Sequence, residues 1–224
     1  MNPTHYARLV EALAAADSST RLQAALAVGT HPDDPGLVDV LVARCAIEPD
    51  FFVRDMLTWA LIRFPTAITV PKVVAELQSE HAQARSQALH TLSKIGDRTV
   101  WPAITRSLLR DGDDEVARSA WRAAVVLVPD GEKAALASDL TAQLGRGDRN
   151  VQLSLSRALI ALGTVIEPAL ETALTSADPV VRAHAAVTER LLRDPDAGFD
   201  QAVEEAKRIV ALGPERTREA EAAC

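Results

Sequence analysis

The stretch EPDFFVRDMLTWALIRFP, residues 48–65, decides the fold. It opens with an acidic turn, whose side chains are suited to accept hydrogen bonds from the free backbone N–H groups of a helix start. Counted from Val53, the apolar or small residues then fall at Leu57, Ala60, Leu61 and Phe64. Residues at these steps share one face of an α-helix. The stretch therefore predicts a capped amphipathic helix whose apolar face packs into a core.

The same arrangement recurs along the chain. The six segments are TRLQAALAVGTH from Thr20, VRDMLTWALIRF from Val53, ARSQALHTLSKI from Ala84, VARSAWRAAVVL from Val116, VQLSLSRALIAL from Val151 and VRAHAAVTERLL from Val181. They begin about 30 to 35 residues apart, which is the period of helical repeat proteins. A second helical segment fits between successive ones, at 35–47, 68–79, 99–110, 133–144 and 165–175. Each unit is therefore predicted to be a two-helix hairpin.

Composition agrees with an all-α fold. Aromatic residues make up only 4% of the chain, while Ala and Leu, which favour helices, recur throughout. A hairpin can bury its apolar face only against the next hairpin, so the expected architecture is a solenoid of six helical hairpins. We expect one solenoid over residues 1–213, closed by a capping helix at 198–212, and a flexible tail at 214–224.

The sixth segment leaves its register open. If the apolar stripe starts at Val181, Glu189 falls in the core; if it starts at Val180, His184 does. We interpret this as irregularity at the end of the array.

An acidic turn, then Val-Arg, then small and Leu positions resembles HEAT repeats of the short bacterial, PBS-lyase-like type, and the HEAT portion of actinobacterial HEAT proteins. The segments from Val53, Ala84 and Val181 carry the resemblance best, and it covers about residues 4–196. The fourth and fifth units depart from it, with Ala117 and Gln152 where the family usually has Arg. The resemblance implies a right-handed α-α superhelix in which the second helices line a concave face. It is specific for architecture and unspecific for function.

Charge and hydropathy exclude some classes of protein. The 224 residues carry a formal net charge of −7, which disfavours a nucleic-acid binder because such proteins present basic surfaces. No apolar run approaches the length of a membrane span, and the N-terminus lacks a signal-peptide layout. The two cysteines, Cys45 and Cys224, make no disulfide framework, so we expect a cytoplasmic protein with a buried, inert Cys45 thiol.

The positions two, six and nine residues after each anchor lie opposite the core stripe. With Trp121 at the shoulder, the candidate binding residues at these positions are Asp55, Trp59, Ser86, His90, Arg118, Trp121, Arg122 and Arg157. Trp and Arg dominate binding hot spots, and Arg forks fit carboxylates and phosphates. We expect this surface to bind a protein, a peptide or an anionic ligand. The structural alternative is that single exposed apolar residues are ordinary, and that loops or a second copy cover Trp59.

A second series of arginines flanks the core one residue after the anchors, at Arg21, Arg54, Arg85 and Arg182. We expect these side chains to pair with the acidic turn residues Asp17, Asp50 and Glu80 as a ladder between units. Such ion-pair networks are structural rather than catalytic.

The chain contains no phosphate-binding loop, dinucleotide-binding glycine motif, nucleophile elbow or zinc-protease motif. DGDDE, residues 111–115, starts like a calcium loop but lacks its later Gly and Glu, so we interpret it as a helix-capping turn. No His lies at zinc-ligand spacing from another His or a Cys. We expect no catalytic residues, no metal and no cofactor.

The predicted function is a non-enzymatic binding or scaffold protein with a protein or peptide partner. Two alternatives remain open: a regulatory or sensor module acting with a transcription factor, and a HEAT-like DNA-binding protein or glycosylase. Asp55, Trp59 and Trp121 only loosely resemble the Asp and Trp set of such glycosylases. Bilin-lyase-like HEAT proteins share the repeat, but no chromophore site is evident. The sequence does not determine the partner, the oligomeric state or the curvature.

Overall fold

The computed structural model describes residues 3–194 together with Val203, Glu204 and Lys207. The chain divides into two compact units, residues 1–127 (unit 1) and residues 128–224 (unit 2). Over the described residues the chain is helical and has no strand, so the predicted all-α class is confirmed. The predicted capping helix at 198–212 lies outside the described residues except for Val203, Glu204 and Lys207, and the predicted tail at 214–224 lies outside them entirely. The single array over residues 1–213 stays a prediction.

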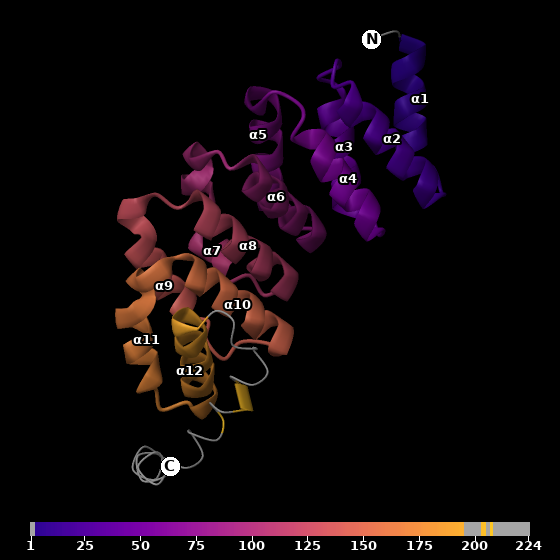
Figure 1. Ribbon diagram of the computed structural model, residues 1–224. Coiled ribbons are helices and arrows are strands. Elements are labelled where there is room, and N and C mark those ends of the chain that lie inside the picture. The colour runs from indigo at the N-terminus through magenta and orange to yellow at the C-terminus, as the bar shows by residue number, and fades with distance from the viewer. Residues whose placement is uncertain (1–2, 195–202, 205–206, 208–224) are drawn as a thin grey trace. The chain divides into compact units, whose positions relative to one another are not determined.

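Unit 1 contains the first four predicted hairpins (Figure 1). Its α-helices are α1 (Pro3–Leu13), α2 (Ser18–Thr30), α3 (Leu37–Ile47), α4 (Phe51–Leu61), α5 (Thr66–Ala75), α6 (Ala82–Ile95), α7 (Arg106–Leu109) and α8 (Asp114–Leu127). Two 3₁₀ helices, η1 (Glu76–Gln78) and η2 (Arg98–Ala103), extend or replace first helices of the hairpins. Helix α2 packs on α4, and α6 packs on α8, so the second helices follow one another as the repeat predicts.

Unit 2 contains two further hairpins. Its elements are η3 (Asp130–Glu132), α9 (Lys133–Thr141), α10 (Arg149–Ala161), η4 (Gly163–Ile166), α11 (Glu167–Leu174) and α12 (Pro179–Arg193). Helix α10 packs on α12, and α11 packs on both α9 and α12. The helical hairpins predicted from the resemblance to HEAT repeats are thus present in both units.

The apolar stripes form the core as predicted. In α4 and the turn after it, Val53, Leu57, Ala60, Leu61 and Phe64 are all buried. The corresponding residues of α10, Val151, Leu155, Ala158, Leu159 and Leu162, are buried as well. Each stripe removes several large side chains from water, the largest favourable term in folding.

The acidic turns cap the second helices. Asp17, Asp50, Asp113, Asp148 and Asp178 each accept hydrogen bonds from backbone N–H groups at the start of α2, α4, α8, α10 and α12. The interpretation of DGDDE as a capping turn is therefore confirmed. Helix α6 differs, because His81 stands at its N-cap and no side chain caps it.

The first helix of the fourth hairpin, predicted over 99–110, is broken instead. Residues Arg98–Ala103 form the 3₁₀ helix η2, and α7 starts only at Arg106. Pro102 has no backbone N–H to donate, and Thr105 is extended, so an α-helix cannot run through this segment.

Helix α12 settles the register of the sixth repeat. His184, Val187, Thr188 and Leu191 are buried, which is the stripe that starts at Val180. Glu189 is therefore not in the core. The core of unit 2 consequently contains a histidine and two hydroxyl side chains, His184, Ser156 and Thr188.

Candidate functional site

Most of the predicted surface residues are accessible, but Trp121 is not. Its side chain is fully buried, with 0% exposure. The indole Nε1–H donates to the carbonyl oxygen of Leu109, the last residue of α7, at 2.8 Å. That carbonyl has no partner inside so short a helix, and the indole supplies one. The placement of Trp121 on the binding surface was wrong, because the ring is buried and its N–H bonds the end of α7.

Ser86 also lies in a helix contact rather than on the surface. It is buried, and its hydroxyl lies 2.9 Å from that of Ser119 on α8. Two small polar residues allow α6 and α8 to approach closely, and this approach covers the position that helical geometry alone leaves exposed. Ser86 therefore helps to fix the spacing of α6 and α8.

Trp59 is half-buried at the contact between α2 and α4. A Cβ added to Gly29 of α2 would lie 2.2 Å from Cζ3 of the Trp59 ring and 2.9 Å from the backbone of Ala60. Only glycine fits under the ring. The Arg63 guanidinium lies over the same ring, 5.7 Å from its centroid. Trp59 therefore joins α2 to α4 and leaves only part of its surface for a partner.

Three cationic side chains of α6 and α8, Lys94, Arg118 and Arg122, form with His90 what we call the basic face. His90 is half-buried, and its pKa is lowered first by burial and then by the positive charges of Arg122 and Lys94. The carboxylate of Asp55 on α4 opposes this shift. Side chains of three successive second helices thus influence one another, as the sequence predicts for adjacent repeats.

Arg122 has little compensation within the fold. Its pKa is lowered first by burial and then by the nearby charge of Arg118, while Glu115 opposes the shift. Its Nη2 donates a hydrogen bond to the hydroxyl of Ser119 at 3.0 Å. Glu115 itself pairs with Arg118. Over the described part of the chain, neither Arg122 nor Lys94 forms an ion pair with a carboxylate.

Arg157, the remaining predicted residue, is exposed on α10 in unit 2. Asp55 is exposed on α4 in unit 1. The structure therefore brings Asp55, His90, Arg118 and Arg122 together within unit 1, and it describes Arg157 separately in unit 2.

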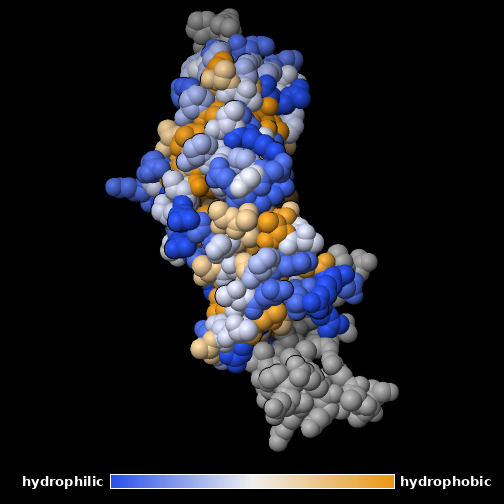
Figure 2. Space-filling model, turned by 90° about the vertical axis from the view of Figure 1, so that its left-hand side faces the viewer, coloured by the Kyte–Doolittle hydropathy of each residue, from blue (hydrophilic) through white to orange (hydrophobic). Residues whose placement is uncertain are grey.

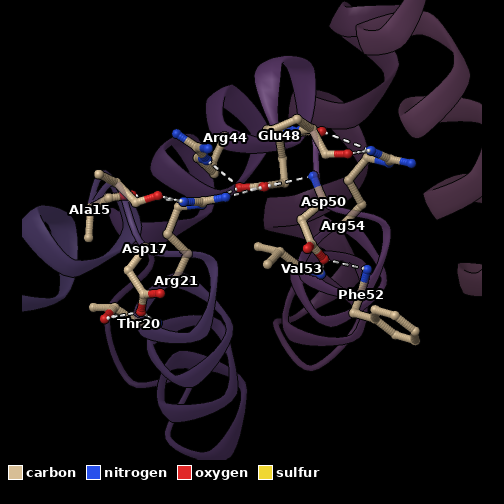
Figure 3. Close-up of polar contacts among 12 residues, drawn as sticks. Ala15, Asp17, Thr20, Arg21, Arg44, Glu48, Asp50, Phe52, Val53 and Arg54 are labelled. Atoms are coloured by element: carbon tan, nitrogen blue, oxygen red, sulfur yellow. Dashed lines mark hydrogen bonds and ion pairs between the residues drawn. The ribbon is translucent and has the colours of Figure 1, made fainter.

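The flanking arginines form a ladder, but with partners other than those predicted. In Figure 3, Arg21 of α2 points at Glu48, which lies in the turn before α4. Its Nε and Nη2 each donate to one carboxylate oxygen of Glu48 at 2.7 Å, while Nη1 donates to the carbonyls of Ala15 and Ala16. Asp17 and Asp50 cap helices instead, so their predicted pairing with arginines was wrong.

Glu48 is the buried centre of this network, with 0% exposure. It also accepts from Nε of Arg44 at 2.7 Å and from the backbone N–H of Asp50 at 3.0 Å. Burial by itself raises the pKa of Glu48, but the hydrogen bonds from Arg21, Asp50 and Arg44 outweigh it and lower the pKa to about 2. Sequence reasoning missed Glu48. Its signal was an acid two residues before the capping Asp, which recurs at Asp111.

Arg85 repeats the arrangement one repeat later. Its Nε and Nη2 donate to the two carboxylate oxygens of Asp111 at 2.9 and 3.1 Å. Its Nη1 donates to the carbonyls of Ser79 and Glu80. The predicted partner Glu80 thus contributes its backbone and not its side chain.

His184 centres a different buried network in unit 2. Its Nδ1 accepts the backbone N–H of Gly145 at 3.0 Å, so Nε2 carries the proton and faces the Gln152 carbonyl and the Ser156 hydroxyl, both at 3.0 Å. The Ser156 and Thr188 hydroxyls lie 2.8 Å apart, and Thr188 donates to the His184 carbonyl. Burial lowers the pKa of His184 to about 4 although the Gln152 hydrogen bond opposes this. The ring is therefore neutral near pH 7.

Two cavities lie beside second helices. A polar one of about 260 Å³ in unit 1 is lined by Arg54, Ala82, Gln83, Ser86, Gln87, Asp113 and Glu115. A larger one of about 640 Å³ in unit 2 lies beside α10 and α12, with Val187 and Val203 in its lining. Val203 also packs against Val187 and Leu191. This larger cavity therefore lies on the surface that the predicted capping helix would cover.

No three His, Cys, Asp or Glu side chains gather at a metal-binding distance within the described residues. Cys45 is a buried free thiol, as predicted, and burial raises its pKa to about 12. Cys224 lies outside the described residues.

Figure 2 shows hydrophobic residues on one face in small groups between hydrophilic ones.

In the described part of the chain, no single helix has the length and apolar character of a membrane span. By length and composition alone, the pair Arg149–Ala161 and Gly163–Leu174 passes when taken together, although the two are bent by 118°.

No protein-family model matches the chain, and no curated protein matches it. Among solved structures, the chain resembles that of the complex of CpcE and CpcF of phycocyanin lyase from Nostoc sp. PCC7120. The likeness covers 94% of this chain and 90% of that chain, at 19% sequence identity and a TM-score of 0.47.

This comparison corrects one expectation. The absence of catalytic motifs in a helical repeat led to the prediction of a protein that is not an enzyme, yet the architecture found here resembles that of a lyase complex. At this identity and TM-score the likeness assigns no activity and no substrate to the chain.

Proposed function

We propose that the chain is a partner-binding protein that recognises an acidic segment of another protein through its basic face. The observation that carries the proposal is the presence of two cations, Lys94 and Arg122, near the His90 ring, with no carboxylate paired to either cation in the described residues. Like charges held close together oppose folding, so their retention in a chain of net charge −7 favours an external anionic partner.

The neighbouring residues add directed contacts to this attraction. Arg122 offers the remainder of its guanidinium fork, and the partly exposed Trp59 ring offers apolar area on the adjacent α4. Arginine and tryptophan contribute most to binding hot spots because they combine area with oriented donors. Asp55, at the edge of the basic face, would disfavour a long polyanion such as a nucleic-acid backbone. We further propose a cytoplasmic location, which suits the free Cys45 thiol.

The experiment uses a fluorescein-labelled peptide rich in Glu and containing one Phe, measured by fluorescence anisotropy at low salt. We expect saturable binding by the wild type and a loss of about tenfold or more for Lys94→Glu with Arg122→Glu, because attraction becomes repulsion. The matched control is Arg98→Glu, which reverses an exposed cation on η2. It should bind as the wild type does.

Two outcomes contradict the proposal. The first is the absence of saturable wild-type binding, and the second is an equal loss in the Arg98→Glu control, which would show that only net charge matters. A DNA duplex that binds more tightly than the peptide would support the nucleic-acid alternative instead.

A further inference from the structure

The arginines that flank the core are not all paired alike. Arg21 and Arg85 each bond a carboxylate in the next turn, whereas Arg54 bonds only backbone carbonyls. At four N-caps the side chain two residues earlier accepts the N-cap's backbone N–H: Glu48 from Asp50, Ser79 from His81, Asp111 from Asp113 and Ser176 from Asp178. These four positions are therefore structurally equivalent. Glu48 and Asp111 also receive the fork of the arginine in the preceding second helix, whereas Ser79 has only a hydroxyl.

Arg54 is held in the same way as Arg21 and Arg85 on its inner side. Its Nη1 donates to the carbonyls of Glu48 and Pro49 at 2.9 and 2.8 Å. In Figure 3 the rest of its guanidinium points away from Glu48. Throughout the described residues, no carboxylate bonds its Nε or Nη2. A guanidinium fork is thus fixed in place on one side and free to form hydrogen bonds on the other.

A polar cavity beside Arg54 contains two groups that attract an anion. The polar cavity of about 260 Å³ is lined by Arg54 and by Ala82 and Gln83 at the start of α6. Among the described second helices of the hairpins, α6 is the one whose N-terminus no side chain caps. Its first backbone N–H groups therefore need an acceptor. Arg54 and the start of α6 therefore line one cavity, on which the carboxylates of Asp113 and Glu115 also border.

An apolar flank adjoins the fork. The Arg54 guanidinium lies over the Phe51 ring at 6.0 Å, and Phe51 packs edge-on against Phe52 at 5.6 Å. Phe51 and Phe52 are 65% and 71% exposed. Exposed neighbouring aromatic rings beside a fixed cation are a common feature of protein contact surfaces.

We propose that Arg54 and the start of α6 bind the carboxylate of a Glu or Asp side chain on a partner segment, with an adjacent apolar residue of that segment on Phe51 and Phe52. A carboxylate is favoured because the equivalent arginines take carboxylates within the fold. A dianionic phosphate is disfavoured because Asp113 and Glu115 also line the cavity. The inference goes beyond the proposed function, since it concerns the start of α4 and α6 and not the basic face.

The first test supplies the carboxylate from within the chain. Ser79→Glu should place a carboxylate beside Arg54 in the same position that the Glu48 carboxylate has beside Arg21. Ser79→Gln has nearly the same size but no charge, and it serves as the control. We expect the thermal midpoint of Ser79→Glu to exceed that of Ser79→Gln by about 2 to 4 °C. Equal midpoints would overturn the proposal, because the fork would then not accept a carboxylate from this position.

The second test adds a ligand. Acetyl-Phe-Glu-amide is titrated into the protein while the side-chain Nε–H signals of arginine are followed by NMR. We expect a saturable shift in the wild type, and its loss in both Ser79→Glu and Arg54→Lys, since lysine has no fork. A shift that persists in Arg54→Lys, or tighter binding of inorganic phosphate than of the peptide, would overturn the assignment. Lys94→Glu with Arg122→Glu should keep this shift, which separates the present site from the basic face.

Discussion

Units 1 and 2 each contain a titratable side chain buried between hairpins, Glu48 and His184, and the two are stabilised in opposite ways. Glu48 in unit 1 stays charged, because two arginine side chains and a backbone N–H surround it. His184 in unit 2 stays neutral, because a backbone N–H occupies Nδ1 and uncharged acceptors face Nε2. The comparison shows that one repeat architecture can stabilise either an ion or a neutral ring at a buried position, depending on the groups that converge there.

The difference also predicts different responses to acid. Both pKa values are lower in the folded chain, so both groups stabilise the fold above their unfolded pKa and lose this contribution as pH falls. For Glu48 the window runs from about 4.5 to about 2. For His184 it runs from about 6.5 to about 4. Unit 2 is therefore expected to respond to acid before unit 1.

The largest expected effect comes from breaking the charged network. Glu48→Ala leaves Arg21 buried without its carboxylate, which should cost about 3 to 5 kcal/mol of unfolding free energy. Urea denaturation followed by tryptophan fluorescence measures this in unit 1, where Trp59, Trp101 and Trp121 all lie. The matched control is Glu80→Ala, an exposed acid in the next turn, which should change stability by less than about 0.5 kcal/mol. Similar losses in both variants would contradict a special role for Glu48.

Acid titration sharpens the comparison between the units. Protonation of His184 should remove up to about 3 kcal/mol from the stability of unit 2 between pH 6.5 and 4, since each pKa unit corresponds to about 1.4 kcal/mol. Helix content measured by far-UV circular dichroism in moderate urea should begin to fall in this window. Tryptophan fluorescence, which reports on unit 1, should hold until lower pH. Coincident transitions would argue against the difference between the two networks.

The smallest expected effect concerns one hydroxyl of the neutral network. Ser156→Ala removes the link between His184 and Thr188 and should cost about 1 kcal/mol, the net value of a buried hydrogen bond. The control is Ser138→Ala on the exposed face of α9, which should be nearly neutral. Urea denaturation followed by circular dichroism measures both. A neutral Ser156→Ala would show that the hydroxyl chain contributes nothing beyond packing.

Much of the fold could be predicted from the sequence because it depends on periodicity. The stripe from Val53 to Phe64 and the capping residues Asp17, Asp50 and Asp178 are local patterns, and local geometry alone fixes their roles. The candidate site was less predictable. Helical position placed Asp55, His90 and Arg122 correctly on the accessible side, but it could not foresee that Trp121 would be buried.

The sequence by itself determined where the second helix of each hairpin lies, the apolar face of the first five of them and the Asp residues that cap most of them, because these depend on steps of a few residues along one helix. Tertiary structure decided which charges meet. Arg21 bonds Glu48 and Arg85 bonds Asp111, although 27 and 26 residues separate the partners. Such pairings depend on how one hairpin lies against the next. Helical periodicity carries no information about that geometry, so Ser79 could be recognised as the exception only when the equivalent turns were compared in space.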